Sequence, residues 1–168
     1  DLEPTGEFQL LILESSISIL EIGDEVGIFD VNGVVESCNP TDGCSDPTYG
    51  ETLVGAGLWS GSQLEISAIM SVDLSDFNGP VLNGYVSGNP IVYKVWTAEN
   101  NTEYNANVEY SAGNGNWGDV LTVVSLLEPI FSIIQDVTLN PFTFNMTSFN
   151  VAPEDVSVES VFGDLDLL

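Results

Sequence analysis

The sequence has almost no basic side chains. It contains no histidine and no arginine, and Lys94 is its one lysine. Without histidine, the chain cannot build a His-dependent catalytic triad or a His-ligated zinc site. Without arginine it has no guanidinium clamp for phosphate, and no glycine-rich phosphate loop surrounds Lys94. Because most common catalytic constellations are excluded, we expect a protein that is not an enzyme.

Charged residues are scarce, and nearly all of them are negative. Twenty-six of the 168 residues are acidic, which gives a net charge of −25, although only 16% of residues are charged. A field of one negative sign repels nucleic acid and attracts cations, so we expect no nucleic-acid partner. Glycoside hydrolysis by a carboxylate pair is the remaining catalytic alternative, but no sequence signature supports it.

Long hydrophobic runs are also missing. No stretch approaches the roughly 18 apolar residues that a membrane helix needs, so we expect no membrane span. Hydrophobic residues make up 43% of the chain, enough for one full core. We predict a β-sandwich domain over 1–128. Residues 129–168 are predicted to be a C-terminal extension, or the start of a second unit, with two strands and a short helix.

The chain has only two cysteines, Cys38 and Cys44. The five residues between them include Pro40 and Gly43, which favour a tight surface turn. Such a turn can bring the two sulfurs together, so we predict a disulfide. A disulfide implies an oxidising compartment and hence an extracellular location. Two free thiols in a reducing cytosol are the alternative.

Apolar residues recur with a period of two, and glycine-rich turns separate the runs. This pattern predicts short strands and an all-β fold, an antiparallel β-sandwich of Ig-like or jelly-roll-like type. Asn32-Gly33 predicts a hairpin turn between strands at 26–31 and 34–36. Gly55 and Gly57 predict that another backbone or a large side chain packs close to them. The expected strands cover 8–13, 17–22, 26–31, 34–36, 53–59, 64–70, 91–97, 104–110 and 120–127.

Three acidic clusters are candidate Ca²⁺ sites, because Ca²⁺ binds six to eight oxygen ligands in proteins. Each cluster offers at most three side-chain donors, so backbone carbonyls or distant strands would have to complete it. The alternative for each cluster is a solvated loop. The clusters are Asp24, Glu25 and, across the predicted hairpin, Asp30; Asp42, Asp46 and Glu51 near the cysteines; and Asp73, Asp76 and Asn78.

Aromatic side chains offer a second kind of candidate site. Trp117 lies in a Gly/Asn-rich turn, so among the tryptophans it is the one we expect to be exposed and able to stack on a sugar ring. The alternative is that Trp117 belongs to the core, as aromatic residues in strand-rich chains commonly do.

Several segments together resemble a module of large secreted proteins of marine bacteria, often exported with a type IX sorting tail. These segments are 23–30 (Gly-Asp-Glu-Val-Gly-Ile-Phe-Asp), 53–59 and 84–96. Residues 151–163 resemble the start of a companion segment that commonly follows. The resemblance implies an exported, multidomain, surface-associated protein. It implies no ligand and no catalytic residue.

These observations lead to one hypothesis and one alternative. The hypothesis is a non-catalytic structural or adhesive module of an extracellular protein, which assembles into a fibre by strand exchange. Its partners would be further copies or neighbouring domains of the same protein. The alternative is a carbohydrate-binding module that recognises a polysaccharide. Calcium is the one cofactor that the acidic clusters suggest.

Overall fold

The computed structural model describes residues 2–44 and 46–130, and within them the fold is all-β, as predicted. Loops connect the strands, and two of them carry single-turn 3₁₀ helices, η1 (Pro40–Asp42) and η2 (Ser75–Phe77). The strands of this described part are β1 (Phe8–Leu13), β2 (Glu25–Glu36), β3 (Thr48–Leu58), β4 (Leu64–Ile69), β5 (Ile91–Thr97), β6 (Thr102–Ala112) and β7 (Leu121–Pro129).

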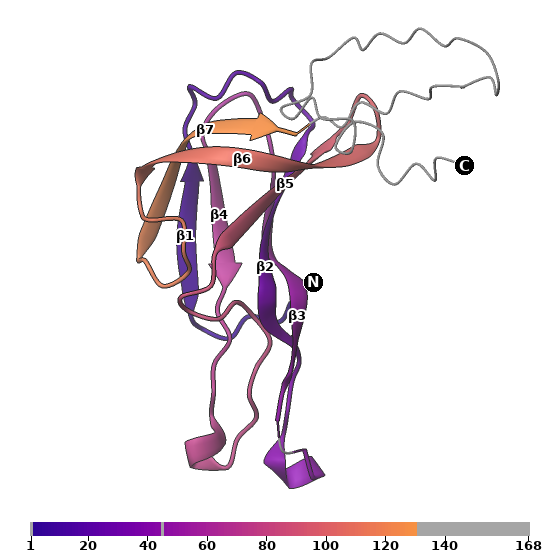
Figure 1. The fold of residues 1–168 in the computed structure, drawn as a ribbon, viewed down its shortest axis with the longest axis vertical. Helices are drawn as coiled ribbons and strands as arrows, with labels where there is room; N and C mark the ends of the chain where they lie inside the picture. Colours follow the sequence, from indigo (N-terminus) through magenta and orange to yellow (C-terminus); the bar gives the residue numbers. More distant parts are fainter. Residues whose placement is uncertain (1, 45, 131–168) are drawn as a thin grey trace, which may run out of the picture. The chain divides into compact units, whose positions relative to one another are not determined.

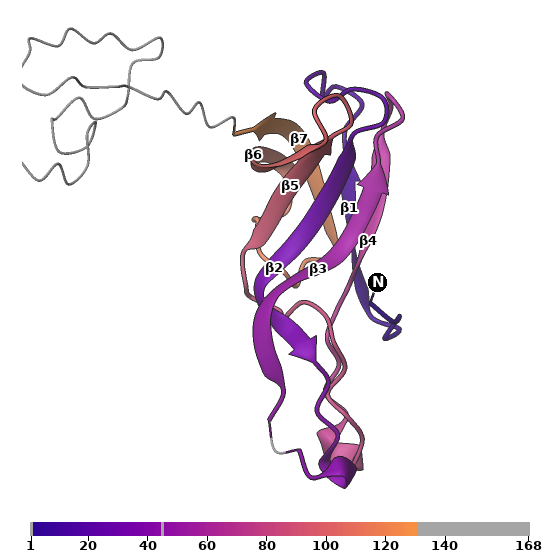
Figure 2. The same ribbon diagram turned by 90° about the vertical axis from the view of Figure 1, so that its right-hand side faces the viewer.

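The strands form one mixed sheet in the order β3-β2-β5-β6-β7-β1-β4 (Figures 1 and 2). Neighbouring strands are antiparallel except β1 and β7, which run parallel, with Leu10–Leu13 opposite Leu121–Val124. The sheet curls until its two end strands, β3 and β4, pack against each other, so it is nearly barrel-shaped. The described strands therefore form one mixed sheet, in place of the two stacked antiparallel sheets of the expected sandwich.

Glycines allow the two end strands to approach. A Cβ atom at Gly55 of β3 would lie 2.8 Å from Cγ2 of Ile66 in β4. A Cβ atom at Gly57 would lie 2.9 Å from Cδ1 of Leu64. Real Cβ atoms do not approach neighbours this closely, so only glycine fits without a shift. The predicted close packing at these two glycines is confirmed.

The interior of the curled sheet is an apolar core that also contains hydrogen-bonded polar side chains, among them Gln9 of β1 and Thr122 of β7. Strands contribute alternate residues, such as Leu11 and Leu13 of β1, in the period-two pattern that the sequence predicts. Gln9 is also fully buried; its Nε2 donates to Thr122 Oγ1 at 2.9 Å and its Oε1 accepts from Gly118 N at 2.8 Å. These bonds satisfy the polar atoms that burial would otherwise leave unpaired.

Two local predictions are wrong. Residues 17–22 form no strand; Ile17 and Leu20 insert into the core from a loop. Asn32-Gly33 is not a turn, because β2 runs through it with a register shift against β3 between Asp30 and Gly33. A Cβ at Gly33 would lie 2.8 Å from the carbonyl oxygen of Gly84, so the glycine serves a close backbone contact instead.

The part of the chain described here contains no helix long and apolar enough to cross a membrane. The strands and helix predicted beyond Ile130 lie outside the described residues. The boundary between the two predicted units therefore stays a prediction.

Candidate functional site

Two long connections leave the same end of the sheet and lie side by side (Figures 1 and 2). The first loop (residues 36–48) joins β2 to β3 and carries η1; the second loop (residues 70–90) joins β4 to β5 and carries η2. Backbone hydrogen bonds tie them together: Cys38 N donates to Val81 O at 3.3 Å, and Val81 N donates to Cys38 O at 2.8 Å. Residues far apart in sequence thus form one distal unit.

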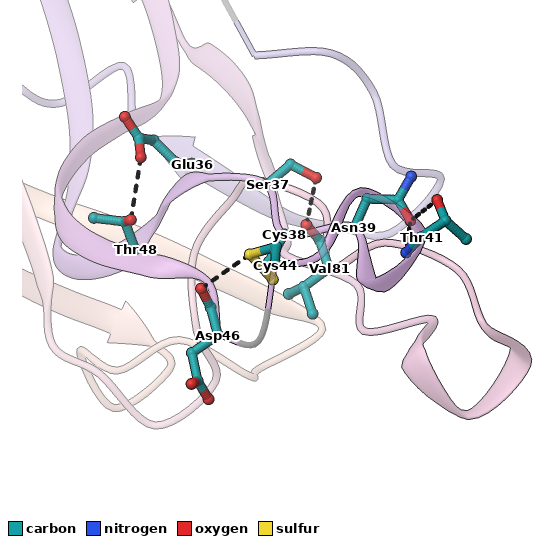
Figure 3. The surroundings of a disulfide bond; sticks show 9 residues. All are labelled: Glu36, Ser37, Cys38, Asn39, Thr41, Cys44, Asp46, Thr48 and Val81. Carbon is teal, nitrogen blue, oxygen red and sulfur yellow. Dashed lines mark hydrogen bonds between the residues drawn. A yellow bond between two sulfur atoms is a disulfide. The ribbon is translucent and has the colours of Figure 1, made fainter.

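The disulfide of the first loop is confirmed (Figure 3). Cys38 and Cys44 are bonded, and their Cα atoms lie 5.5 Å apart. The ring closes because η1 turns the chain between them, with Asn39 Oδ1 accepting from Thr41 N at 3.1 Å. Gly43 ends η1 at φ 81°, a left-handed conformation that favours glycine. The turn residues from which the disulfide is predicted therefore bring the two cysteines together.

The second loop folds around Asp73. Its Oδ1 accepts from Ser75 N at 2.8 Å, and hydrogen bonds from Ser75 hold the pKa of Asp73 below its usual value. Asn78 ends η2 in the left-handed region at φ 56°. Phe77, between them, is 83% exposed. This loop therefore presents a charged carboxylate and a large apolar ring at the distal end.

A cleft of about 480 Å³ lies between the two loops and the adjoining strands. Its walls combine apolar side chains with two carboxylates and three hydroxyls, a mixed composition that is found in small-molecule and side-chain binding sites. The lining residues are Val34, Cys38, Pro40, Asp46, Pro47, Tyr49, Met70, Ser71, Asp73, Ser75, Val81 and Val86. We call this the distal cleft.

The distal cleft combines residues that the sequence assigned to separate clusters. Asp46 comes from the second predicted calcium cluster and Asp73 from the third, and both line the same cavity. Tyr49, at the start of β3, is 52% exposed and offers an aromatic face beside them. Carboxylates, hydroxyls and one aromatic ring can accept and donate hydrogen bonds to a polar ligand while an apolar surface contacts its body.

The first predicted calcium cluster does not converge. Its members were expected to meet across a hairpin at Asn32-Gly33, and that hairpin is absent. Asp24 instead precedes β2 and Asp30 lies inside it, while the Glu25 side chain is exposed. Asp24 is buried and accepts from the backbone nitrogens of Glu21 at 2.8 Å and Ala98 at 3.0 Å.

Asp30 is fully buried and connects β2 to the second loop. Its carboxylate accepts from Asn32 N at 2.8 Å, from Val86 N at 2.8 Å and from Asn89 Nδ2 at 3.0 Å. A buried carboxylate is stable only when such donors surround it. Asp30 therefore fixes the base of the second loop to the sheet.

The remaining members of the predicted calcium clusters lie on separate elements. Asp42 lies in η1, Asp76 lies in η2, and both are exposed, as is Asn78. Glu51 turns toward Lys94. Across 2–44 and 46–130, no group of three or more acidic or cysteine side chains is placed to hold a metal ion. Calcium binding stays a prediction.

Lys94 occupies a site that sequence reasoning missed. Its Nζ lies 2.6 Å from Glu51 Oε1 and 3.5 Å from Glu103 Oε1. The same ammonium sits 4.3 Å from the ring centre of Phe29, a cation–π contact. The single lysine thus joins β2, β3, β5 and β6, and its hydrogen bond to Glu51 raises the pKa of its amine. No local pattern in the sequence pairs these residues.

The expected exposure of Trp117 is wrong. Trp117 is 2% exposed, and its ring stacks on that of Tyr85 with centroids 4.2 Å apart and planes at 10°. The Gly/Asn-rich turn around it folds inward, with Trp117 N donating to Asn89 O at 2.8 Å. Because one face of the indole is covered by Tyr85 and the rest by the core, Trp117 cannot stack on a sugar.

Tyr49, Ser71 and Val86 belong to the distal cleft, and sequence reasoning singled out none of them. Tyr49 lies two residues after Pro47 and five after Cys44, and an aromatic residue close to a constrained turn is the signal that could have found it. Ser71 and Val86 carry no such signal, because the pairing of the two loops places them there.

Comparisons with known proteins leave the chain without a match. No family model matches the sequence, and searches of curated proteins and of solved structures found no match either. The resemblance to secreted modules of marine bacteria therefore stays a prediction.

Proposed function

We propose that the protein is a non-catalytic adhesive module of an extracellular protein, which binds its partner through the distal cleft. The observation that carries the proposal is the cleft itself: about 480 Å³, between two loops that are fixed to each other and to the sheet. A preformed concave site with mixed apolar and polar walls is the usual form of a binding site.

The location and the absence of catalysis rest on separate support. The Cys38–Cys44 disulfide is stable in oxidising compartments, which is compatible with secretion. The sequence lacks histidine and arginine, so a reaction in the cleft would have to use carboxylates and hydroxyls alone. The negative net charge favours a neutral or cationic partner over an anionic one.

Polysaccharide is the ligand class that one specific observation favours. Tyr49 presents a half-exposed ring at the cleft, which Asp46 and Ser71 also line. An aromatic face can cover the apolar face of a sugar ring, while carboxylates and hydroxyls bond its hydroxyl groups. This supports the carbohydrate-binding alternative, now placed at the cleft rather than at Trp117.

Binding of the full chain to a printed glycan array, repeated on beads coated with a basic protein, tests both statements. We expect retention on at least one surface, at least tenfold weaker for Tyr49→Ala. Phe8→Ala, which removes another exposed ring that does not line the cleft, is the matched control and should bind as wild type does.

Four results would count against the proposal. Retention on no surface would reject adhesion, and retention on the basic protein alone would reject polysaccharide. Equal losses in Tyr49→Ala and Phe8→Ala would reject the cleft as the binding site. Release of reducing sugar ends from a bound polysaccharide would reject the non-catalytic assignment.

A further inference from the structure

The sheet is not fully closed by hydrogen bonds. β3 and β4 end the strand order, and within the described residues each has one ladder partner, β2 for β3 and β1 for β4. They pack through Gly55 and Gly57, but no ladder joins them. Each therefore keeps an edge with backbone groups available for another strand, the template that added strands use.

A small cavity marks this open seam. It has a volume of about 160 Å³ and is lined by Leu53, Gly55 and Ala56 of β3 and by Ser67 and Ile69 of β4, with Leu2 beside them. Its walls are uncharged. The seam is thus a neutral groove along an edge of a protein whose net charge is −25.

The edge of β3 carries few of the features that block strand addition. Natural edge strands commonly use lysine, proline or inward-pointing charges against pairing. From Thr52 to Leu58 the strand has none of these, and its one nearby charge, Glu51, is engaged by Lys94. Leu53 and Leu58 are exposed on it. An apolar, glycine-rich edge of this kind favours a strand partner.

The sequence of this chain contains a segment with matching chemistry. Residues 142–151 alternate in a pattern that predicts a strand, and no charged residue occurs from 137 to 153. A charged strand would meet repulsion from the acidic surface, whereas an uncharged one would not. Phe142, Phe144 and Met146 fall on one face of such a strand and would cover exposed Leu53.

The topology favours a second molecule as the source of that strand. The segment follows β7, which pairs with β6 on one edge and, along Leu121–Val124, with β1 on the other. A strand after β7 therefore cannot pair with the first half of β7. To reach β3 in the same molecule it would have to cross either β6, β5 and β2 or β1 and β4, and a neighbouring molecule requires no such crossing.

We propose that the free edge of β3, residues 52–58, accepts residues 142–151 of a second copy of this chain as an added strand. The exchange links molecules head to tail, and repetition builds an open filament. This assembly does not depend on ligand binding at the distal cleft, so either proposal can fail alone.

Cysteine cross-linking between two differently marked full-length chains tests the exchange. One chain carries Ala56→Cys, at an exposed position of the β3 edge. The other carries Phe144→Cys, Met146→Cys or Ser148→Cys, a series that allows for the unknown register. Mixing under mild oxidation should give a dimer that contains both chains for at least one member of the series. Val120→Cys, which is highly exposed on the β6–β7 connection, replaces Ala56→Cys as the control and should give at least fivefold less.

A double variant separates exchange from folding back within one molecule. A chain carrying both Ala56→Cys and the productive donor cysteine should form dimers and longer chains. Cross-linking only within monomers would overturn the proposal, and so would cross-linking no stronger than that of the Val120→Cys control.

Sedimentation velocity in high salt, which screens the acidic repulsion, provides a second readout without cysteines. The wild-type chain should form species larger than monomers as concentration rises. Met146→Pro removes a backbone donor from the added strand and should abolish them, while Ser157→Pro, outside the segment, should not. A monomer at all concentrations, or equal assembly of the two proline variants, would overturn the proposal.

Discussion

The body of the sheet and the distal loops of this protein are stabilised by different interactions. In the body, each strand buries alternate residues, and a continuous apolar cluster runs from Leu11 of β1 to Leu127 of β7. In the loops, η1 and η2 contain no buried residue. The loops keep their shape through the Cys38–Cys44 bond and through backbone pairing such as that of Cys38 with Val81.

This difference has a consequence for function. The apolar core of the body is packed so closely that adding or removing one methylene group changes its stability. A cross-link and backbone hydrogen bonds, by contrast, fix the path of the loops while leaving the side chains of η1 and η2 unburied. Side chains at the distal end can therefore serve binding with little effect on the core. Substitutions in the body and in the distal loops test this difference.

The largest loss of stability should follow Trp117→Ala. It removes the ring that stacks on Tyr85 and leaves a cavity in the core. Large-to-small substitutions of buried aromatics cost about 3–5 kcal/mol, which denaturant unfolding monitored by fluorescence of the remaining tryptophans measures. Phe77→Ala, in the exposed second loop, should change stability by no more than about 0.5 kcal/mol. Similar losses for the two variants would contradict the contrast between body and loops.

Asp30→Ala should have the next largest effect, because Asp30 joins the two regions. The substitution leaves the backbone nitrogen of Val86 and the amide of Asn89 without their acceptor in a buried place. Unsatisfied buried donors cost about 1–3 kcal/mol, and hydrogen exchange should speed up in the second loop before the sheet opens. Asp42→Ala, an exposed acid in η1, is the control. If Asp30→Ala matched that control, the buried carboxylate would not anchor the loop.

The sequence predicts the body much better than the loops. The bounds of β5 follow from its β-branched and aromatic residues, and β6 shows the expected alternation of half-buried and exposed side chains. These predictions succeed for one reason. In a strand that packs on one face, buried and exposed side chains alternate, so the sequence of the strand itself shows which residues face the core. The close packing at Gly55 and Gly57 is likewise indicated by the local sequence, through the glycines themselves.

The failures come from contacts between distant segments. The neighbours of Trp117 in the sequence suggest that it is exposed, but Tyr85, from another connection, and the rest of the core bury it. The distal cleft depends on the pairing of Cys38 with Val81, which no local pattern encodes. The disulfide is the exception within the loops, because proline and glycine close together in sequence determine that ring.

Removing the disulfide should affect the loops more than the body. On the chain-entropy model, Cys38→Ala with Cys44→Ala loses roughly 2 kcal/mol, because the ring is small. Hydrogen exchange should become faster over residues 36–48, while amides of β1 and β5 keep their protection relative to the new global stability. Exchange that accelerates in β1 as much as in the first loop would show that the body depends on the loop.

The smallest effect should follow Lys94→Met, which keeps the contact with Phe29 but removes the charge. Lys94 is 16% exposed, and its partners Glu51 and Glu103 are about half exposed, so the loss should stay within about 1 kcal/mol and shrink in high salt.

The hydrogen bond to Glu51, and then the charge of Glu103, raise the pKa of the amine. A raised pKa means that the folded state holds the proton more tightly, so the benefit is complete at neutral pH. It disappears as pH rises above the ordinary lysine value of about 10.4. Burial raises the pKa of Tyr93 in the same direction, and therefore only the difference between wild type and variant isolates Lys94. Chemical denaturation from pH 7 to 11 should show a constant difference that closes at the alkaline end, with Lys94→Arg following wild type at neutral pH. A difference that grows with pH would mean that the charge of Lys94 does not stabilise the body.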